Sequence, residues 1–213
     1  MTKSTISSRK LDHIELAFAS QLSEVDQRFY YEPMLSAHPT LSTIPGLTFG
    51  GAPMQVPLWI SSMTGGAEKA GKINVLLAEV CKTYGLGMGL GSCRPVLENS
   101  EYSKDFEVRK YIGEQPLFAN LGIAQIEELI ALNQLQKLVD MVNRLEANGL
   151  IIHVNPLQEW MQPEGDRFNL SPIDTVKRVL DFVSFPIVVK EVGQGFGPKS
   201  LEALLKLPLE ALD

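Results

Sequence analysis

Short apolar runs alternate with longer segments of helical periodicity from residue 56 onward, and this alternation constrains the fold most. The clearest runs are residues 86–90, 116–119, 149–152 and 185–189. Runs that are apolar at nearly every position are typical of parallel strands buried on both faces. Helical segments with short connections join them, the longest expected over residues 126–148. The sequence therefore predicts an α/β protein with a parallel sheet.

Within this class, the pattern favours a (β/α)8 TIM barrel. A first apolar run lies at residues 56–60, and no G-x-G-x-x-G motif follows it, so a dinucleotide-binding sheet is not indicated. Five complete βα units are present, and a sixth has begun where the sequence reaches Asp213. A full barrel has eight strands and about 250 residues. We therefore expect a partial barrel of about five and a half units over residues 56–213, preceded by a leader over residues 1–55.

The composition is that of an ordinary globular protein, with 45% hydrophobic residues among 213. No apolar run approaches the roughly 18 residues needed to cross a bilayer. The first ten residues are polar and lack the apolar centre of a secretory signal. Only two cysteines occur, Cys81 and Cys93, which indicates a reducing, cytoplasmic setting. A net charge of −6 argues against a nucleic-acid-binding surface.

Polar side chains or glycines follow all five apolar runs, at the strand ends where a barrel builds its active site. The fourth of these segments is the densest. His153, Asn155, Gln158 and Glu159 follow one buried strand, and Pro156 prevents the regular continuation of that strand. In a core, each of these polar groups would have to be desolvated and paired, so together they indicate a binding site.

Charged residues in these segments suit an anionic ligand. Lys190 ends a core strand, and Arg94 follows a Gly-Ser turn from which it could grip a phosphate bidentately. Beside a diphosphate, Glu159 would be a natural Mg²⁺ ligand, because Mg²⁺ takes few protein carboxylates together with water and phosphate oxygens. Taken singly, each of these residues is explained by an ordinary solvated charge, and so are Arg9 and Lys10 near the terminus.

Seven motifs occur in order from about residue 9 onward. They are Arg9-Lys10-x-x-His13-Ile14, Met63-Thr64-Gly65-Gly66, Gly91-Ser92-x-Arg94, Ala119-Asn120-Leu121-Gly122, His153-x-Asn155-x-x-Gln158-Glu159, Pro163-Glu164-Gly165-Asp166-Arg167 and Val189-Lys190-Glu191-Val192-Gly193. In this order they resemble the type 2 isopentenyl-diphosphate isomerase family.

The resemblance implies a TIM-barrel enzyme that interconverts isopentenyl and dimethylallyl diphosphate in isoprenoid biosynthesis. Reduced FMN and Mg²⁺ are implied as cofactors, with NADPH or another reductant keeping the flavin reduced and no net redox change. The implied FMN contacts are Ser62, Met63, Thr64, Ser92, Asn120 and Lys190. The implied substrate contacts are Arg9, Lys10, Ser92, Arg94, His153, Asn155 and Gln158, and the implied metal ligand is Glu159. His153 and Gln158 are the candidate catalytic side chains, and a full-length homotetramer or homo-octamer is expected.

Two other interpretations stay open. An FMN-dependent oxidoreductase of the 2-hydroxy-acid oxidase or dihydroorotate dehydrogenase type would share the barrel and a flavin-contacting lysine. Such an enzyme would need neither Arg9-Lys10 nor the Gln158-Glu159 pair. The other interpretation is an inactive fragment of the isomerase. Barrels usually bind a cofactor phosphate in the loops after their seventh and eighth strands, and the given sequence reaches only the sixth strand. We therefore expect this chain alone neither to close a barrel nor to turn over substrate.

Overall fold

A computed structural model of the chain describes residues 15–16, 19, 34–35, 37, 46–62, 68–163 and 165–213. The chain divides into two compact units, Met1–Thr43 and Ile44–Asp213. Four of the predicted site residues, Arg9, Lys10, Met63 and Thr64, lie outside the described residues, so their roles stay predictions. The division into a leader over residues 1–55 and a barrel over residues 56–213 also stays a prediction.

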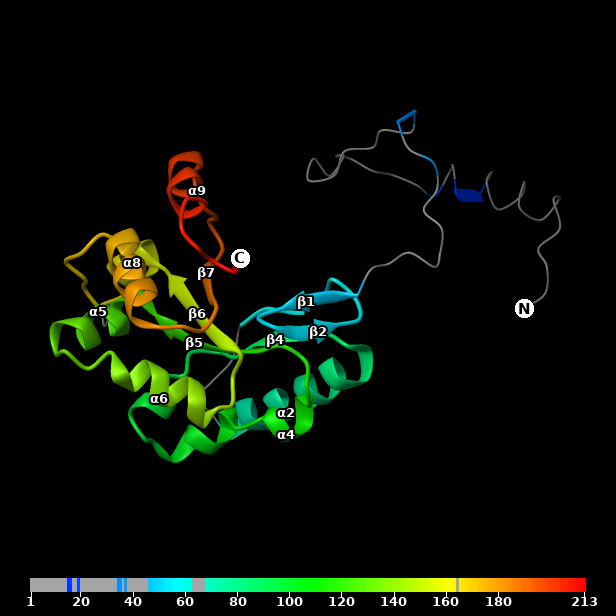
Figure 1. Cartoon of the computed structure of the whole chain (residues 1–213), viewed down its shortest axis with the longest axis horizontal. Helices are drawn as coiled ribbons and strands as arrows, with labels where there is room; N and C mark the ends of the chain where they lie inside the picture. Colours follow the sequence, from blue (N-terminus) through cyan, green and yellow to red (C-terminus); the bar gives the residue numbers. More distant parts are fainter. Residues whose placement is uncertain are drawn as a thin grey trace. The chain divides into compact units, whose positions relative to one another are not determined.

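Six parallel strands form the sheet in the described part of the second unit, and each pairs with the next in chain order (Figure 1). They are β3 (Trp59–Ile60), β4 (Gly87–Gly89), β5 (Leu117–Gly122), β6 (Gly149–Val154), β7 (Ile187–Glu191) and β8 (Ala211–Leu212). This confirms the predicted α/β class with a parallel sheet. The strand order is that of a barrel, and β3 and β8 are its outer strands, so the described strands form an open part of a barrel.

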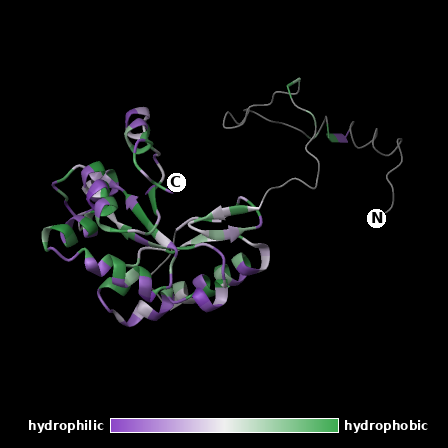
Figure 2. Ribbon diagram, in the orientation of Figure 1, coloured by the Kyte–Doolittle hydropathy of each residue, from purple (hydrophilic) through white to green (hydrophobic). Residues whose placement is uncertain are grey.

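Helices follow the strands in the expected alternation. They are α2 (Glu68–Tyr84), α3 (Arg94–Leu97), α4 (Arg109–Ile112), α5 (Ile123–Ala131), α6 (Gln136–Arg144), α7 (Pro156–Met161), α8 (Pro172–Phe182) and α9 (Pro198–Leu204), with a 3-10 helix η1 (Glu101–Phe106). Figure 2 shows that the helices flanking the sheet carry both hydrophilic and hydrophobic segments, as expected for helices with one buried face. Among the described helices, none is long and apolar enough to cross a membrane.

The single long helix expected over residues 126–148 is wrong, because α5 and α6 replace it. The break falls at Asn133, whose φ of 55° is left-handed, a conformation that asparagine adopts more readily than most residues. The amide of Gln134 donates to the carbonyl of Leu129 at 2.7 Å and closes the end of α5. Both helices contact β5, so the apolar periodicity continues across the break and does not reveal it.

The two faces of the sheet carry two separate apolar clusters, because side chains alternate along a strand. Residues such as Leu121 and Ile152 face the helices and join the main core. Phe118, Ile151 and Val188 lie on the inner face and form the second cluster, with Phe49, Trp59 and Ala211 packed against it. The inner face of the partial barrel is therefore filled by side chains near the beginnings of its strands.

A β-hairpin covers this inner cluster. Its strands are β1 (Leu47–Phe49) and β2 (Ala52–Met54), which pair antiparallel. The ring of Phe49 packs against those of Trp59 and Phe118, with centroids 5.0 and 5.3 Å away. Gly50 turns the hairpin with a φ of 57°, and a Cβ there would lie 2.6 Å from the Phe118 ring. Glycine is thus required for both conformation and space.

Replacing Phe118 with alanine is expected to lower the free energy of unfolding by about 3–4 kcal/mol, because a fully buried ring between Phe49 and Trp59 is lost. Urea unfolding followed by circular dichroism measures the change. The control is Leu205→Ala, since Leu205 is 74% exposed; it should cost less than about 0.5 kcal/mol. Equal losses in the two variants would contradict the packing of the inner cluster.

Candidate functional site

A cavity of about 410 Å³ opens at the carboxyl ends of the strands, beyond the inner apolar cluster. Every predicted site residue within the described part of the chain lines it. These residues are Ser62, Ser92, Arg94, Asn120, His153, Asn155, Gln158, Glu159 and Lys190. The structure thus brings together side chains from five successive strand ends, which is the geometry expected of a barrel active site.

The floor of the cavity follows from strand alternation. Phe118, Ile151 and Val188 are inner-face residues of β5, β6 and β7. Two positions further along the same strands lie Asn120, His153 and Lys190, which must face the same side of the sheet. On each of these three strands, an apolar inner-face side chain is therefore followed by a polar one. Lys190 pairs with Asp213 of the sixth strand end, with 3.5 Å between Nζ and Oδ2.

Asn120 orients His153 through two hydrogen bonds. The buried amide Nδ2 of Asn120 donates to the carbonyl of Leu90 at 3.1 Å, so its Oδ1 is turned toward His153. The Nδ1 of His153 lies 2.9 Å from that oxygen and must donate to it. The proton of a neutral imidazole is thereby assigned to Nδ1, which leaves the Nε2 lone pair as the acceptor of the ring.

His153 is held in its neutral form. Burial lowers the pKa of His153, because desolvation disfavours the charged imidazolium. The charge of Glu159 opposes this shift, and the charge of Lys190 adds to it. Lys190 is the cross-strand neighbour of His153 in the register of β6 and β7. Since the imidazole is neutral, His153 can accept a hydrogen bond but is a poor acid at neutral pH.

Ser62 brings an unsatisfied hydroxyl to the cavity. Its Oγ is buried and has no hydrogen-bond partner among the described residues. Gly89 lies so close that a Cβ there would meet the same Oγ, so this part of the wall admits only a glycine. A buried hydroxyl without a partner is costly, and a polar ligand atom would remove that cost.

Asn155, Gln158 and Glu159 are carried by a helix that the sequence analysis missed. Pro156 ends the strand as expected, but it also occupies the first turn of α7, where its missing N–H costs nothing. Asn155 precedes that turn, and its Nδ2 donates to Glu159 Oε1 at 2.9 Å. The buried amide of Asn155 therefore holds the carboxylate of Glu159 at the cavity wall.

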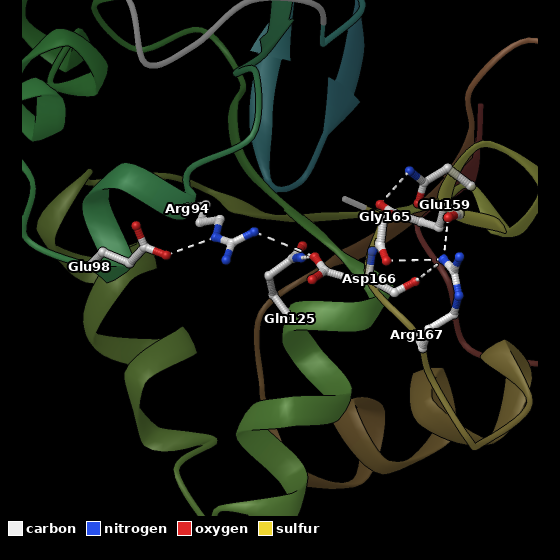
Figure 3. A network of polar contacts seen from close by, with 8 residues as sticks. Arg94, Glu98, Gln125, Glu159, Gly165, Asp166 and Arg167 are labelled. Carbon is white, nitrogen blue, oxygen red and sulfur yellow. Dashed lines mark hydrogen bonds and ion pairs between the residues drawn. The ribbon is translucent and has the colours of Figure 1, made fainter. Parts of the chain in front are cut away.

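Arg94 reaches the cavity from the start of α3. Its Nε bonds to Glu98 Oε1 at 2.7 Å, and its Nη1 lies 3.4 Å from Asp166 Oδ2 (Figure 3). The hydrogen bond to Glu98 raises the pKa of Arg94, and Asp166 acts in the same direction, against a lowering by burial. The guanidinium is thus a permanent positive charge at the mouth of the cavity.

Five lining residues were not predicted as site residues: Gly91, Gln125, Gln162, Asp166 and Val192. Gln125 lies in the first turn of α5, directly after β5, and its Nε2 donates to Asp166 Oδ2 (Figure 3). The rule that strand-to-helix connections build barrel sites could have identified Gln125. Asp166 belongs to a motif that the sequence analysis quoted, but its charged turn resembles any solvated loop.

A second cavity of about 500 Å³ lies between α8 and α9, with an apolar lining that includes Val176, Phe196 and Ala203. Its one carboxylate, Glu191, is engaged by its own loop and accepts the N–H groups of Gly193 and two following residues at 2.6–2.8 Å. Burial disfavours the ionised form of Glu191, but these bonds outweigh it and lower the pKa of the carboxyl. The convergent polar groups are in the first cavity, which is therefore the candidate site.

The fold and the cavity at its strand ends define an α/β-barrel type of protein. Among solved structures, a mandelate oxidase mutant described with a monooxide FMN adduct resembles the chain with a TM-score of 0.53. The likeness covers 78% of this chain and 49% of the other, at 13% identity, and therefore concerns the fold alone. No family model matches the chain.

The chain is a homologue of proteins named isopentenyl-diphosphate delta-isomerase, which confirms the resemblance in its motifs. The Cronobacter sakazakii protein is 39% identical over 100% of this chain and 62% of its own length. The Synechocystis protein is 36% identical over 96% of this chain and 60% of its own length, and the Rickettsia akari protein is 37% identical with the same coverage. The chain thus spans about 60% of the length of these curated relatives.

His153 is expected to titrate below its ordinary pKa of 6.5. An NMR titration measures this pKa, and the His153 ring signal is assigned as the one that is absent in His153→Gln. As the pH falls below 6.5, the unfolded chain takes up the proton before the folded chain does, so the free energy of unfolding decreases until the folded-state pKa is reached. His153→Gln should lack this part of the pH dependence, and titration of His153 at or above 6.5 would refute the assignment.

Proposed function

We propose that this protein acts in the isomerisation of isopentenyl diphosphate to dimethylallyl diphosphate, with reduced FMN and Mg²⁺ as cofactors. The supporting observation is the convergence of nine predicted residues on one cavity in a homologue of proteins named for this reaction. NADPH or another reductant would keep the flavin reduced, and the reaction itself would involve no net redox change.

The inner face of the partial barrel fits a flavin. Ser62 offers a buried hydroxyl without a partner, Asn120 a buried amide, and Lys190 a cation whose side chain is 15% exposed. These groups would bind the polar edge of the ring system, while Ser92 and the undescribed Met63 and Thr64 would complete its contacts. When bound, reduced FMN would supply the acid–base chemistry that no side chain of the cavity offers to an apolar alkene carbon.

The opposite wall fits a diphosphate and its metal ion. Arg94 is permanently charged, and Asn155, Gln158 and the neutral His153 bring groups able to donate or accept hydrogen bonds. Glu159 is a half-buried carboxylate at the same wall, and Mg²⁺ bound to a diphosphate needs few protein ligands. Arg9 and Lys10 would add positive charge to this clamp.

The chain's own residues would position the alkene and assist the proton transfers. Binding energy from the diphosphate clamp would hold the alkene against the flavin in a reactive orientation. Gln158 would relay or orient a proton, because an amide is not a strong acid. His153 would act as a hydrogen-bond acceptor through Nε2, since its Nδ1 proton is engaged by Asn120.

The alternative of an FMN-dependent oxidoreductase has weaker support. The mandelate oxidase structure shares the fold at 13% identity, which does not extend to its chemistry. An oxidoreductase would reduce FMN with its own substrate, whereas the isomerase would leave the flavin redox state unchanged. We further propose a cytoplasmic homotetramer or homo-octamer, and the two free, buried cysteines agree with a reducing compartment.

The isomerase proposal predicts activity in a completed barrel. The test compares this chain with a chimera in which it is joined to the C-terminal part of the Cronobacter sakazakii relative that lies beyond the matched segment. With isopentenyl diphosphate, Mg²⁺, FMN and NADPH or dithionite, the chimera should form dimethylallyl diphosphate and the chain alone should not. A chimera that binds FMN but forms no product would overturn the proposal and favour an oxidoreductase.

The metal role of Glu159 predicts a weakened response to Mg²⁺. In the chimera, Glu159→Gln should raise the Mg²⁺ concentration needed for half-maximal activity by about tenfold or more, because a carboxylate ligand becomes a neutral amide. Titration of activity with Mg²⁺ measures this. Glu202→Gln is the control, since Glu202 of α9 pairs with Lys206 on the surface; an equal Mg²⁺ requirement in both variants would exclude Glu159 as the ligand.

A further inference from the structure

Two carboxylates share the guanidinium of Arg94, and only one of them faces the cavity. Glu98 is the nearer, at 2.7 Å from Nε, but it does not line the cavity. Asp166 lies 3.4 Å from Nη1 and does line it (Figure 3). Arg94, the cation of the proposed phosphate clamp that the structure describes, is therefore already next to a negative charge of the protein on its cavity-facing side.

Asp166 is held in place by two hydrogen bonds and by the close packing of the residue before it. Its Oδ2 accepts a hydrogen bond from Gln125 Nε2 at 2.5 Å, and its own N–H donates to Glu159 Oε2 at 2.7 Å. The preceding Gly165 packs so closely on α7 that a Cβ there would collide with the carbonyl oxygen of Glu159. Asp166 is thus built into the wall of the cavity.

The rest of the loop is fixed to α5 as well. The carboxylate of Glu127, which is 9% exposed, accepts the backbone N–H of Asn169 at 2.6 Å and that of Leu170 at 3.2 Å. Helix α5 therefore holds this loop at two points, through Gln125 and through Glu127. A segment so restrained cannot withdraw Asp166 from the cavity without breaking several bonds.

We propose that Asp166 competes with the anionic ligand for Arg94 and thereby makes diphosphate binding depend on a divalent cation. This inference rests on the proposed function, since it takes the ligand to be a diphosphate. A metal-free diphosphate carries several negative charges, and it would meet the carboxylates of Asp166 and Glu159 together at the cavity wall. A cation held by Glu159 would offset that repulsion, because Glu159 is bonded to the backbone of Asp166 itself.

The expected size of the effect is moderate. The side chains of Arg94 and Asp166 are 50% and 41% exposed, so solvent screens their charges. A single charge next to a multiply charged ligand in such surroundings changes affinity by about tenfold. Asp166 is thus expected to set the selectivity between metal-bound and free ligand, while the bonds to Arg94 still supply the attraction.

Calorimetric titration of this chain with inorganic pyrophosphate, with and without Mg²⁺, tests the proposal. Asp166→Asn should bind metal-free pyrophosphate about tenfold more tightly than the unchanged chain. With saturating Mg²⁺, the two should agree within about twofold. The substitution keeps the side-chain volume, the backbone N–H to Glu159 and an oxygen able to accept from Gln125, and thermal unfolding checks that the fold is kept.

Glu98→Gln is the matched control, because it removes a charge from the same guanidinium on the side away from the cavity. It should change metal-free binding by about twofold or less. An equal gain in both variants, or no gain in Asp166→Asn, would overturn the inference while pyrophosphate binding to the unchanged chain with Mg²⁺ still upheld the proposed function. If neither the unchanged chain nor Asp166→Asn bound pyrophosphate with Mg²⁺, this inference would be overturned, while the activity of the chimera would still decide the proposed function.

Discussion

The two-residue alternation of side chains along parallel strands is the constraint on which the cavity depends. In β5, β6 and β7 it places one apolar side chain and then one polar side chain on the inner face, and the residues of β6 and β7 are paired with each other in register. The apolar layer, covered by the hairpin, gives the polar layer a rigid support. A shift of one residue in any strand would send its polar group into the helix-facing core.

The charged wall of the cavity depends on different forces. Asn155, Gln158 and Glu159 are positioned by a short helix, and Asp166 by a loop that hydrogen bonds hold against α5. These segments bury little apolar surface, and every residue of α7 except Glu159 is exposed. The strand ends therefore form the stable part of the site, and the α7 segment is the part whose geometry rests on polar contacts.

The sequence allowed prediction of the parallel sheet and of nine residues that line the cavity, because buried strands and polar strand ends leave strong local patterns; the polar lining residues Gln125, Gln162 and Asp166 were not predicted. It did not allow prediction of α7, because a helix of six residues is too short to show a repeated pattern, although Leu157, Trp160 and Met161 have helical spacing. Nor did it reveal the break at Asn133, since both helices bury the same kind of face. The pairing of Arg94 with Asp166 joins residues 72 positions apart, and no local pattern encodes such a contact.

The hydrogen bonds through Asn120 have a consequence for the chemistry of the imidazole. Their direction starts at a main-chain carbonyl, that of Leu90, which can only accept. The side-chain amide of Asn120 must therefore point its NH₂ group at this carbonyl, and the imidazole of His153 must donate its Nδ1 proton to the amide oxygen. A main-chain carbonyl at one strand end therefore sets the direction of both hydrogen bonds, and it keeps its acceptor character at every pH.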